Sequence, residues 1–508
     1  MSRINTNINS LIAQRVLGQQ NKALGLSLER LSTGLAINRG SDDPAGLIAS
    51  EKLRTNITKI ETALGNAERA DQLVGVAEGG LQEVNTLLVE LQGLVGEVAN
   101  DAGLSTEEKE ANQTQIDGIV QTIDRIADTT SFLGAKLLNG TYDFQVSAGS
   151  VNDRVLDYQV NGAKLGSTST AVNVLVTQSA QHGGLFLSTG GALELNDDAT
   201  NLLTLEIAGA KGAREFSFAS GATLNDIRDA INAYTEATGV SAATSGTGIV
   251  VKSDEFGADN FVSVDVVSEG ELNTDVATAG VYLLSSNDEN TARSAADNTD
   301  FVDVSSPIRD DGQHIGAVVN GQTARGNGTE ISVNTEGLEI AITLSSTGNG
   351  AQLLGSFTAL GITGGGAEFN LGSDVNITNQ VRIGIQNVAA RSLGTQSLGF
   401  VDDLGSGKTN NVIDGDVTGA QRIVDEAIDQ VTALRGRLGS FQSFVVGSTI
   451  NSLSIELENT RAAESAIRDT DFAKETAELT RRQVLVAAAT SALSISNVQG
   501  QNVLNLLQ

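Results

Sequence analysis

The sequence has no cysteine and no tryptophan, and its single methionine is residue 1. Without cysteine the chain can form no disulfide bond and can carry out no thiolate chemistry. The two histidines, His182 and His314, do not lie in an HExxH motif, so no zinc peptidase site is expected, and both are interpreted as surface residues. These residue types therefore predict no metal site, no cofactor and no catalytic residue.

Long uninterrupted apolar runs are also missing. The most apolar stretch, residues 471–508, is broken by serine, asparagine and glutamine, and it falls short of the roughly 18 apolar residues of a membrane span. Residues 1–16 contain no continuous apolar core and no small-residue cleavage site, so a cleaved signal peptide is not expected. If the protein is exported, another machine must carry it.

Positive charge is scarce, because 32 Lys and Arg stand against 62 Asp and Glu, giving a formal net charge of −30. Such an acidic excess argues against nucleic acid or an anionic membrane as a partner. Residues 1–56 carry seven basic and four acidic side chains, and residues 461–508 carry five of each. Because the ends contribute +3 and 0, the region between them carries −33. Near-neutral ends suit segments that pack against copies of themselves.

Both ends of the chain have the apolar periodicity of helices that need a partner. At the C-terminal end a seven-residue apolar row is joined by a second row, so the helix is apolar on most of its circumference. Such a helix must be buried on most sides, which favours an assembly of many chains; an intramolecular bundle of the two terminal helices is the alternative. The predicted assembly residues are Ile4, Ile8, Leu11, Leu17, Leu24, Leu28, Leu31, Leu35, Leu479, Val486, Leu493, Ile495, Val503, Leu504 and Leu507.

A longer helical pattern follows the first helix. Breakers around Pro44, at residues 36–46, predict the end of the first helix. The pattern then continues to about residue 99, and its apolar spacing predicts a phase slip or local unwinding at Gly79 and Gly80.

Two further long helices are expected. Ser105 and Glu108 form a capping-box pattern that opens one of them, and heptads return at about residues 413–459. The predicted core of the long helices is Ile57, Ile60, Leu64, Leu88, Leu91, Val95, Ile116, Ile119, Ile123, Ile428, Val431, Leu438, Val445, Leu453 and Leu457.

The middle of the chain is rich in Gly, Ser, Thr, Asn and Asp and has short alternating apolar runs, which are typical of β-strands. We interpret 144–146 and 155–160 as a β-hairpin, and a β-α-β-β module is expected at about 206–267. The predicted fold class is α+β and multidomain, with N- and C-terminal coiled-coil helices paired with each other around a β-rich insertion. The expected domains are 1–46 with 460–508, 47–165 with 413–459, and 166–412.

The joints between these segments resemble bacterial flagellins. The N-terminal signature is LERLSTGLAIN at 28–38, followed by DDPAG at 42–46. The C-terminal signature is ESAIRDTDFAKE at 464–475, and the chain ends in VLNLLQ. The resemblance covers about residues 1–165 and 413–508, whereas the middle is only loosely similar, through TLNDIRDAIN at 223–232.

The resemblance implies a structural subunit of the extracellular flagellar filament, a homo-polymer that is not an enzyme. It further implies export of the unfolded chain through the flagellar type III channel, with a chaperone on the C-terminal helix, and polymerisation beneath a cap. The terminal helices would form the inner tubes of the filament and the long helices an outer tube. A hook-associated junction protein of the same superfamily is the alternative, as is an adhesin or hydrolase activity of the middle region.

The resemblance also implies a binding partner. Many flagellins are recognised by Toll-like receptor 5, which contacts an exposed Arg and a Leu on a helix that aligns with residues 88–100 of this chain. This chain keeps Leu94 but has Glu90 where the Arg is usual. Replacing a cation by an anion reverses any pairing that it made. Weak recognition by the receptor is therefore predicted.

Other motifs give little support for a nucleotide-binding or calcium-binding site. GSGKT at 405–409 resembles part of a phosphate-binding loop, but Asp402 stands where that pattern needs glycine, so 406–411 is interpreted as a flexible linker. Acidic pairs at 197–198, 310–311 and 414–416 match no calcium loop and are interpreted as solvated turns.

Overall fold

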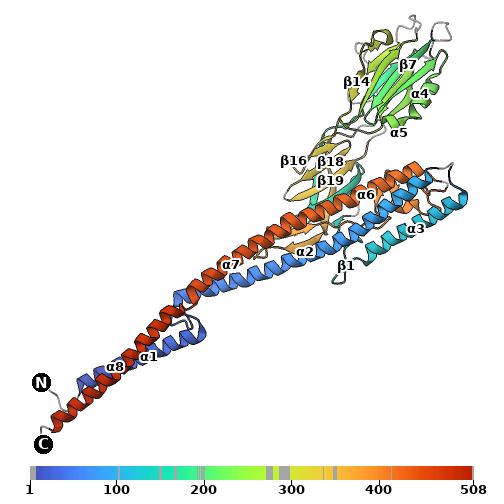
Figure 1. Ribbon diagram of the computed structural model, residues 1–508. Helices are drawn as coiled ribbons and strands as arrows, with labels where there is room; N and C mark the ends of the chain where they lie inside the picture. The colour runs from blue at the N-terminus through green and yellow to red at the C-terminus, as the bar shows by residue number, and fades with distance from the viewer. Residues whose placement is uncertain are drawn as a thin grey trace. The chain divides into compact units, whose positions relative to one another are not determined.

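The computed structural model describes residues 7–505, without 101–102, 148–150, 165–168, 191–192, 194, 196–200, 271–278, 285–297, 336, 347–351 and 414; of 298, 302 and 499–505 only the backbone is described. The chain forms two compact units. The terminal unit contains Met1–Gln72, Phe369–Gln380 and Ser440–Gln508, and the central unit contains Leu73–Glu368 and Val381–Gly439. Helices flank a β-rich middle, so the predicted α+β class is confirmed (Figure 1).

The terminal unit is helical, with α1 (Ile8–Thr33), the start of α2 (Pro44–Val98), the π-helix η5 (Phe441–Gly447), α7 (Ser448–Arg468) and α8 (Phe472–Asn505). α1 lies along α8 (Figure 1). Gly34 ends α1 in the left-handed region (φ 76°), where glycine has no steric penalty. Thr470 N–H then donates to the Gly34 carbonyl at 2.9 Å, which ties the end of α1 to the start of α8.

The predicted break before α2 is present. Asp43 Oδ1 accepts hydrogen bonds from the N–H groups of Ala45 (3.1 Å) and Gly46 (2.9 Å), and Pro44 opens the helix where a missing N–H costs nothing. α8 begins in the same manner, because Asp471 Oδ1 accepts from the N–H of Ala473 at 3.0 Å.

α2 shows no break at Gly79 and Gly80, so the predicted slip is wrong. Its buried apolar residues alternate in steps of three and four along the helix, with Leu73 beside Val74 in the same stripe. They are Ile60, Ala63, Ala67, Ala70, Leu73, Val74, Ala77, Leu81, Val84, Leu88, Leu91, Val95 and Val98. The alanines carry the phase through the region where the larger residues alone suggested a slip. A Cβ at position 80 would stand 2.8 Å from Leu138 Cδ1 and from Thr130 Oγ1, so Gly80 makes room for a close approach.

The central unit combines the rest of α2 with α3 (Thr106–Thr129) and α6 (Val417–Ser440). The capping box of Ser105 and Glu108 opens α3, as predicted. α3 leads to the small hairpin β1 (Ser131–Phe132) and β2 (Ala135–Lys136).

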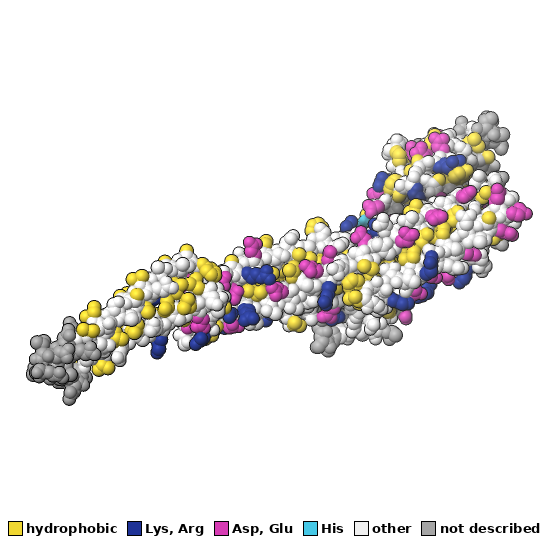
Figure 2. Space-filling view, turned by 60° about the horizontal axis from the view of Figure 1, so that its bottom comes forward, with side chains coloured by type: hydrophobic (Ala, Val, Ile, Leu, Met, Phe, Trp, Pro, Cys, Tyr) yellow, Lys and Arg dark blue, Asp and Glu magenta, His cyan; other side chains and the backbone are white. Residues whose placement is uncertain are grey.

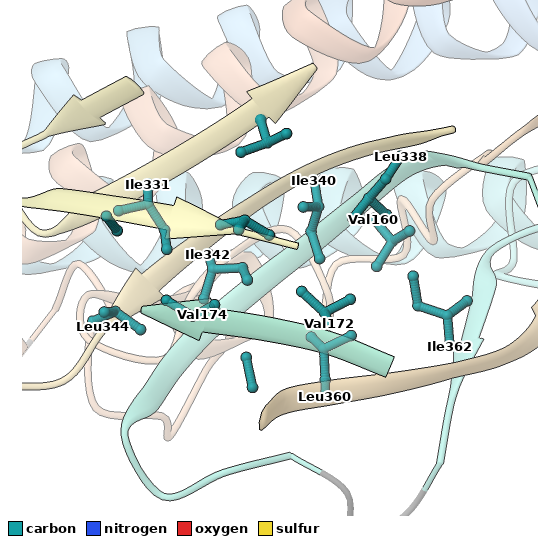
Figure 3. Packing of buried hydrophobic residues seen from close by; sticks show 14 of the residues in the cluster. Val160, Val172, Val174, Ile331, Leu338, Ile340, Ile342, Leu344, Leu360 and Ile362 are labelled. Carbon is teal, nitrogen blue, oxygen red and sulfur yellow. The ribbon is translucent and has the colours of Figure 1, made fainter. Parts of the chain in front are cut away.

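An inner β module contains two sheets. Their orders are β16-β15-β5-β20-β3 and β17-β18-β19-β4. The strands are β3 (Phe144–Val146), β4 (Val155–Ala163), β5 (Thr170–Gln178), β15 (Gly316–Val319), β16 (Gln322–Thr323), β17 (Arg325–Asn327), β18 (Glu330–Asn334), β19 (Leu338–Leu344) and β20 (Gly355–Gly365). Alternate residues such as Val172, Val174, Ile340 and Ile342 point into one aliphatic core (Figure 3).

The predicted hairpin of 144–146 with 155–160 is wrong. β3 pairs with β20, and β4 pairs with β19, in different sheets. Both partners lie about 200 residues later in the chain, which strand periodicity cannot indicate.

An outer β module holds the sheets β13-β12-β6-β10-β9 and β14-β11-β7-β8. Its strands are β6 (Gly184–Ser188), β7 (Leu202–Gly209), β8 (Ala213–Ala219), β9 (Val240–Ser245), β10 (Gly248–Ser253), β11 (Phe261–Ser268), β12 (Gly280–Leu283), β13 (Asn298–Asp300) and β14 (Ile308–Asp311). Within 206–267, where a strand, a helix and two strands are expected, the chain has β7, β8, α4 (Leu224–Asn232), α5 (Thr235–Thr238), β9, β10 and β11, and β8 lies in a different sheet from β9 and β10. Ile227 and Ile231 of α4 enter the core of this module.

The remaining short elements are η3 (Phe301–Asp303), β21 (Ala367–Asn370), β22 (Gln380–Ile383), β23 (Gly394–Thr395), β24 (Gly399–Phe400) and η4 (Val401–Leu404). Within the described residues, no helix is both long enough and apolar enough to span a membrane.

Candidate assembly surface

In the described part of α1 and α8 the fully buried side chains are small, whereas the large ones are half-buried or exposed. Ser10 and Ser27 of α1 and Ala489 of α8 are buried, with exposed fractions of 8%, 4% and 8%. Ser10 Oγ donates to Asn497 Oδ1 at 2.8 Å, and Arg482 donates to Gln20 Oε1 at 3.1 Å. The seam is therefore narrow and partly polar, unlike an ordinary helical core.

The predicted assembly residues divide into two sets. Half-buried side chains are Leu17, Leu24, Leu31, Leu35, Leu479, Val486 and Leu493. Exposed side chains are Ile8 (54%), Leu11 (56%), Leu28 (51%) and Ile495 (62%). Ile4 and Leu507 lie outside the described residues, and of Val503 and Leu504 only the backbone is described.

Further exposed aliphatic side chains, which the sequence prediction did not select as sites, extend this surface. Ile12, Val16, Val484, Leu485 and Val498 are exposed to between 37% and 64%. Figure 2 shows hydrophobic side chains gathered over α1 and α8, at the left of the view. A shallow groove of about 290 Å³ between the two helices is lined by Ile12, Val16 and Ala492 among others. Exposed apolar surface of this extent marks an interaction site.

Several charges of this region are paired with one another. Glu478 accepts hydrogen bonds from Arg481 and Arg482, and the bond from Arg481 is the main reason that the pKa of Glu478 is lowered. Arg30 lies 3.9 Å from Glu475. These pairs offset part of the charge of the two helices, whose sequence segments are near neutral overall.

The predicted long-helix core residues are mostly buried. Buried side chains are Ile60, Leu88, Leu91, Val95, Ile116, Ile119, Ile123, Val431, Leu438 and Leu453. Half-buried side chains are Ile57, Leu64, Ile428, Val445 and Leu457. In the terminal unit, Leu64 and Leu457 pack against a cluster of Ile60, Ala63 and Leu453. The prediction used the periodicity of large apolar residues, so it did not include buried alanines. For example, Ala427 is buried whereas the neighbouring Ile428 is half-buried.

The π-helix η5 explains why Val445 is not in the core. The buried positions along this part of the chain step from Leu438 to Phe441 and then by five residues to Val446. A π-turn holds one more residue than an α-turn, so it moves the apolar stripe from Val445 to Val446. Phe441 packs on Phe369 with ring centroids 6.0 Å apart, and Phe444 is left 75% exposed.

The other candidate positions are the two receptor-facing residues and the two histidines. Glu90 is exposed and Leu94 is half-buried on α2. His182 and His314 are half-buried rather than surface residues; His314 Nδ1 accepts the Gly328 N–H at 3.0 Å, and the His182 ring lies against Phe256.

The segment at 406–411 is held in place and is not a free linker. The buried Gln113 side chain donates to the Leu404 carbonyl at 2.9 Å and accepts from the Val412 N–H at 2.9 Å. Lys408 pairs with Asp402 at 3.0 Å, so its cation already has a carboxylate partner.

The acidic pairs have internal partners where they are described. Asp310 accepts from the Gly184 N–H at 2.8 Å, and Asp311 pairs with Arg309 at 2.6 Å. Asp197, Asp198 and Asp414 lie outside the described residues. Across the part of the chain that the structure describes, no three acidic or histidine side chains gather as metal ligands would.

Comparison with known proteins agrees with this arrangement. The family description "Bacterial flagellin N-terminal helical region" matches residues 4–143, and "Bacterial flagellin C-terminal helical region" matches 421–507. "Flagellin hook IN motif" matches 203–255, which contains β8, α4 and β9. Together these ranges cover more than half of the chain.

Whole-chain relatives carry the same name. Flagellin A of Helicobacter pylori is 27% identical over 557 residues, covering 99% of both chains. Flagellin B of that organism is 29% identical and covers 100% of this chain and 99% of its own. The B-type flagellin of Pseudomonas aeruginosa is 28% identical, with 99% of each chain covered. The family matches at both helical ends and these full-length relatives show that the chain belongs to the bacterial flagellins and is a structural subunit of the flagellar filament.

Proposed function

We propose that this flagellin polymerises through the exposed aliphatic side chains of α1 and α8, each copy covering those of its neighbours. The observation that carries the proposal is the pattern of burial in this helix pair, in which the fully buried side chains are small and several large apolar side chains are exposed. Small residues such as Ser10 and Ala489 lie in the seam, whereas Leu11, Val484 and Ile495 face outward. Covering one such side chain is worth about 1.5–3 kcal/mol, and many copies of the contact recur along a polymer.

A pair of neighbouring substitutions tests this surface. Val484 is 64% exposed, and the adjacent Gln483 is also exposed on α8. We expect Val484→Ser to raise the critical concentration for polymerisation about tenfold or more, since the lost burial is worth at least 1.4 kcal/mol. Gln483→Ser should polymerise normally. The readout is sedimentation of seeded filaments, and equal polymerisation of both variants would contradict the proposal.

Export of the chain is a second part of the proposed function. We propose that the chain leaves the cell unfolded through the flagellar type III channel, while a chaperone holds α8. Absence of cysteine supports this route, because no disulfide can form before or during transit. Co-purification of the full chain with the chaperone, lost on removal of residues 472–508, is the expected result.

Cap and hook-associated proteins are proposed as the further partners of this filament subunit, since they would meet the same terminal helices. Toll-like receptor 5 is proposed to respond only weakly. Glu90 is exposed on α2, where it would repel an acidic group that an arginine binds. A reporter-cell response to this chain should be well below that to an Arg-bearing flagellin, and Glu90→Arg should raise it.

The chain is proposed to have no catalytic role, in keeping with relatives named for a structural protein. Turnover of a hydrolase substrate by the purified full chain, lost on substitution in the β modules, would contradict this proposal and favour the alternative of an active middle region.

A further inference from the structure

Five asparagines of this chain are followed directly by glycine. Because glycine has no Cβ, its backbone nitrogen can approach the side-chain amide carbon of the preceding asparagine. These Asn-Gly pairs begin at Asn139, Asn161, Asn320, Asn327 and Asn349. Asn349 lies outside the described residues, so the surroundings of the other pairs can be compared.

In three of the described pairs, hydrogen bonds hold the asparagine side chain in place. Asn139 Oδ1 accepts from the hydroxyl group of Thr141 at 2.7 Å. Asn161 Oδ1 accepts from the guanidinium of Arg437. Asn320 is bonded through both polar atoms of its side chain to backbone groups of β5. These bonds restrain the rotation that would bring the side-chain carbon onto the next backbone nitrogen.

Asn327 is the exception. It is the last residue of β17, it is exposed, and its side chain makes no hydrogen bond to any residue that the structure describes. Gly328 follows in the short turn between β17 and β18, with φ 54°. Exposed side chains change rotamer freely, so the Asn327 amide can reach the Gly328 nitrogen.

The Gly328 N–H donates to an imidazole rather than to another backbone group. His314 Nδ1 accepts this N–H at 3.0 Å and a weaker contact from the Ala258 N–H at 3.4 Å. Because Nδ1 is the acceptor, the imidazole proton is on Nε2, which lies 3.6 Å from Asp259 Oδ2. In a catalytic triad a carboxylate orients an imidazole base in the same way. His314 is therefore within reach of the proton that it would remove from Gly328.

We propose that Asn327 is a site of spontaneous deamidation, with His314 as the base and Asp259 as a positioning residue. The Gly328 nitrogen attacks Asn327 Cγ while His314 Nδ1 takes the proton of that nitrogen, and the new C–N bond closes a succinimide ring. The imidazole returns the proton to the side-chain nitrogen, which leaves as ammonia. One water molecule from solvent then cleaves either carbonyl–nitrogen bond of the ring, leaving an aspartate or an isoaspartate at position 327.

The reaction adds a carboxylate beside an acid that is already unfavourably placed. Asn327 pairs with Glu330 across the turn between β17 and β18. Burial raises the pKa of Glu330, and the nearby Glu426 and Asp157 raise it further. Like charges opposite each other destabilise a strand pair. Deamidation should therefore loosen β17, which is an edge strand of its sheet.

The four described pairs provide the test within one molecule. The purified full chain is incubated at neutral pH and body temperature, digested, and analysed by peptide mass spectrometry, which separates asparagine, aspartate and isoaspartate at each pair. We expect Asn327 to react about tenfold faster or more than Asn139, Asn161 and Asn320. In guanidinium chloride, where the folded contacts are lost, the pairs should react at similar rates.

Two substitutions test the roles of the neighbouring side chains. His314→Gln keeps an acceptor for the Gly328 N–H but removes the base, so the reaction at Asn327 should slow about tenfold while that at Asn320 is unchanged. Asp259→Asn, at a side chain that is 85% exposed, should slow the reaction by a smaller factor, because the imidazole is less well oriented. The circular dichroism spectra of both variants should match that of the unsubstituted chain.

Each outcome decides the inference. If Asn327 reacts no faster than Asn320 in the folded chain, the site is overturned. If it reacts faster but at the same rate in both variants, the free side chain alone is responsible and the role of His314 is overturned. Should His314→Gln disturb the fold, seen as a faster reaction at Asn320, the Asp259→Asn rate decides the role of the imidazole. The reaction takes place within one chain, so none of these outcomes depends on polymerisation.

Discussion

Gly79 and Gly80 are neighbours on α2 with different surroundings. A Cβ added at position 79 meets nothing within 4 Å, whereas one at position 80 meets Thr130 and Leu138 at 2.8 Å. Gly79→Ala should stabilise the chain by about 0.5–1 kcal/mol, because alanine loses less backbone entropy in a helix. Gly80→Ala should lose that gain or destabilise, since both neighbours must move. Denaturant unfolding followed by far-UV circular dichroism measures both, and equal gains would contradict the close approach at Gly80.

Asp310 is a residue at which stability should depend on pH. Burial raises its pKa above the ordinary 3.8, despite the hydrogen bond from Gly184. The folded chain therefore binds the proton more tightly than the unfolded chain, and stability from this group falls as pH rises above 3.8. Asp310→Asn should raise the melting temperature at neutral pH and flatten its decline from acid pH. Glu255→Gln, at an exposed position of the same module, controls for loss of one negative charge.

At the scale of elements, the π-turn of η5 decides which of two adjacent valines belongs to the core. Val446 is fully buried and Val445 is half-buried. Val446→Ala should cost about 2 kcal/mol of unfolding free energy, and Val445→Ala about 1 kcal/mol or less. The same ranking of thermal unfolding midpoints is expected, and a larger loss at Val445 would mean that the helix runs through this region without a π-turn.

The segment after η4 depends on one buried amide. Gln113 bonds the Leu404 carbonyl and the Val412 N–H, so Gln113→Leu leaves two backbone groups without their partner. We expect a loss of about 1–3 kcal/mol, and faster proteolytic cleavage at 405–411. Gln115→Leu, on the exposed side of α3, should leave both unchanged. Equal cleavage of the two variants would show that the segment is a free linker.

For the whole molecule, we expect the order of α1 and α8 to differ between the single chain and the filament. The α1–α8 pair buries few large side chains, and isolated helices of this kind are marginal in water. Amide hydrogens of α1 and α8 should exchange rapidly in dilute monomers and slowly in filaments. The buried stretch of α2 between Ile60 and Leu91 should be protected in both states. Slow exchange of α1 and α8 in lone molecules would refute assembly-driven ordering.

Much of the helical part was predictable because its signals are local. The cap at Ser105, the break before Pro44 and the apolar rows of both ends all act within one or two turns. Prediction failed at two kinds of position in the core. Alanines such as Ala77 continue the apolar stripe of α2 where a phase slip was predicted, and Val446 is buried where Val445 was predicted. Alanine is only weakly hydrophobic, so it contributes little to an apolar periodicity, and a π-turn has no sequence pattern of its own.

The sequence by itself determined the helical ends, the β-rich middle, the family and the near-neutral charge of the assembling segments, because periodicity, caps and charge are properties of neighbouring residues. Only the tertiary structure decided which strands pair, that 406–411 is fixed by Gln113, and which sides of α1, α7 and α8 stay uncovered. Those features depend on contacts between residues far apart in the chain, and such contacts leave no local pattern in the sequence.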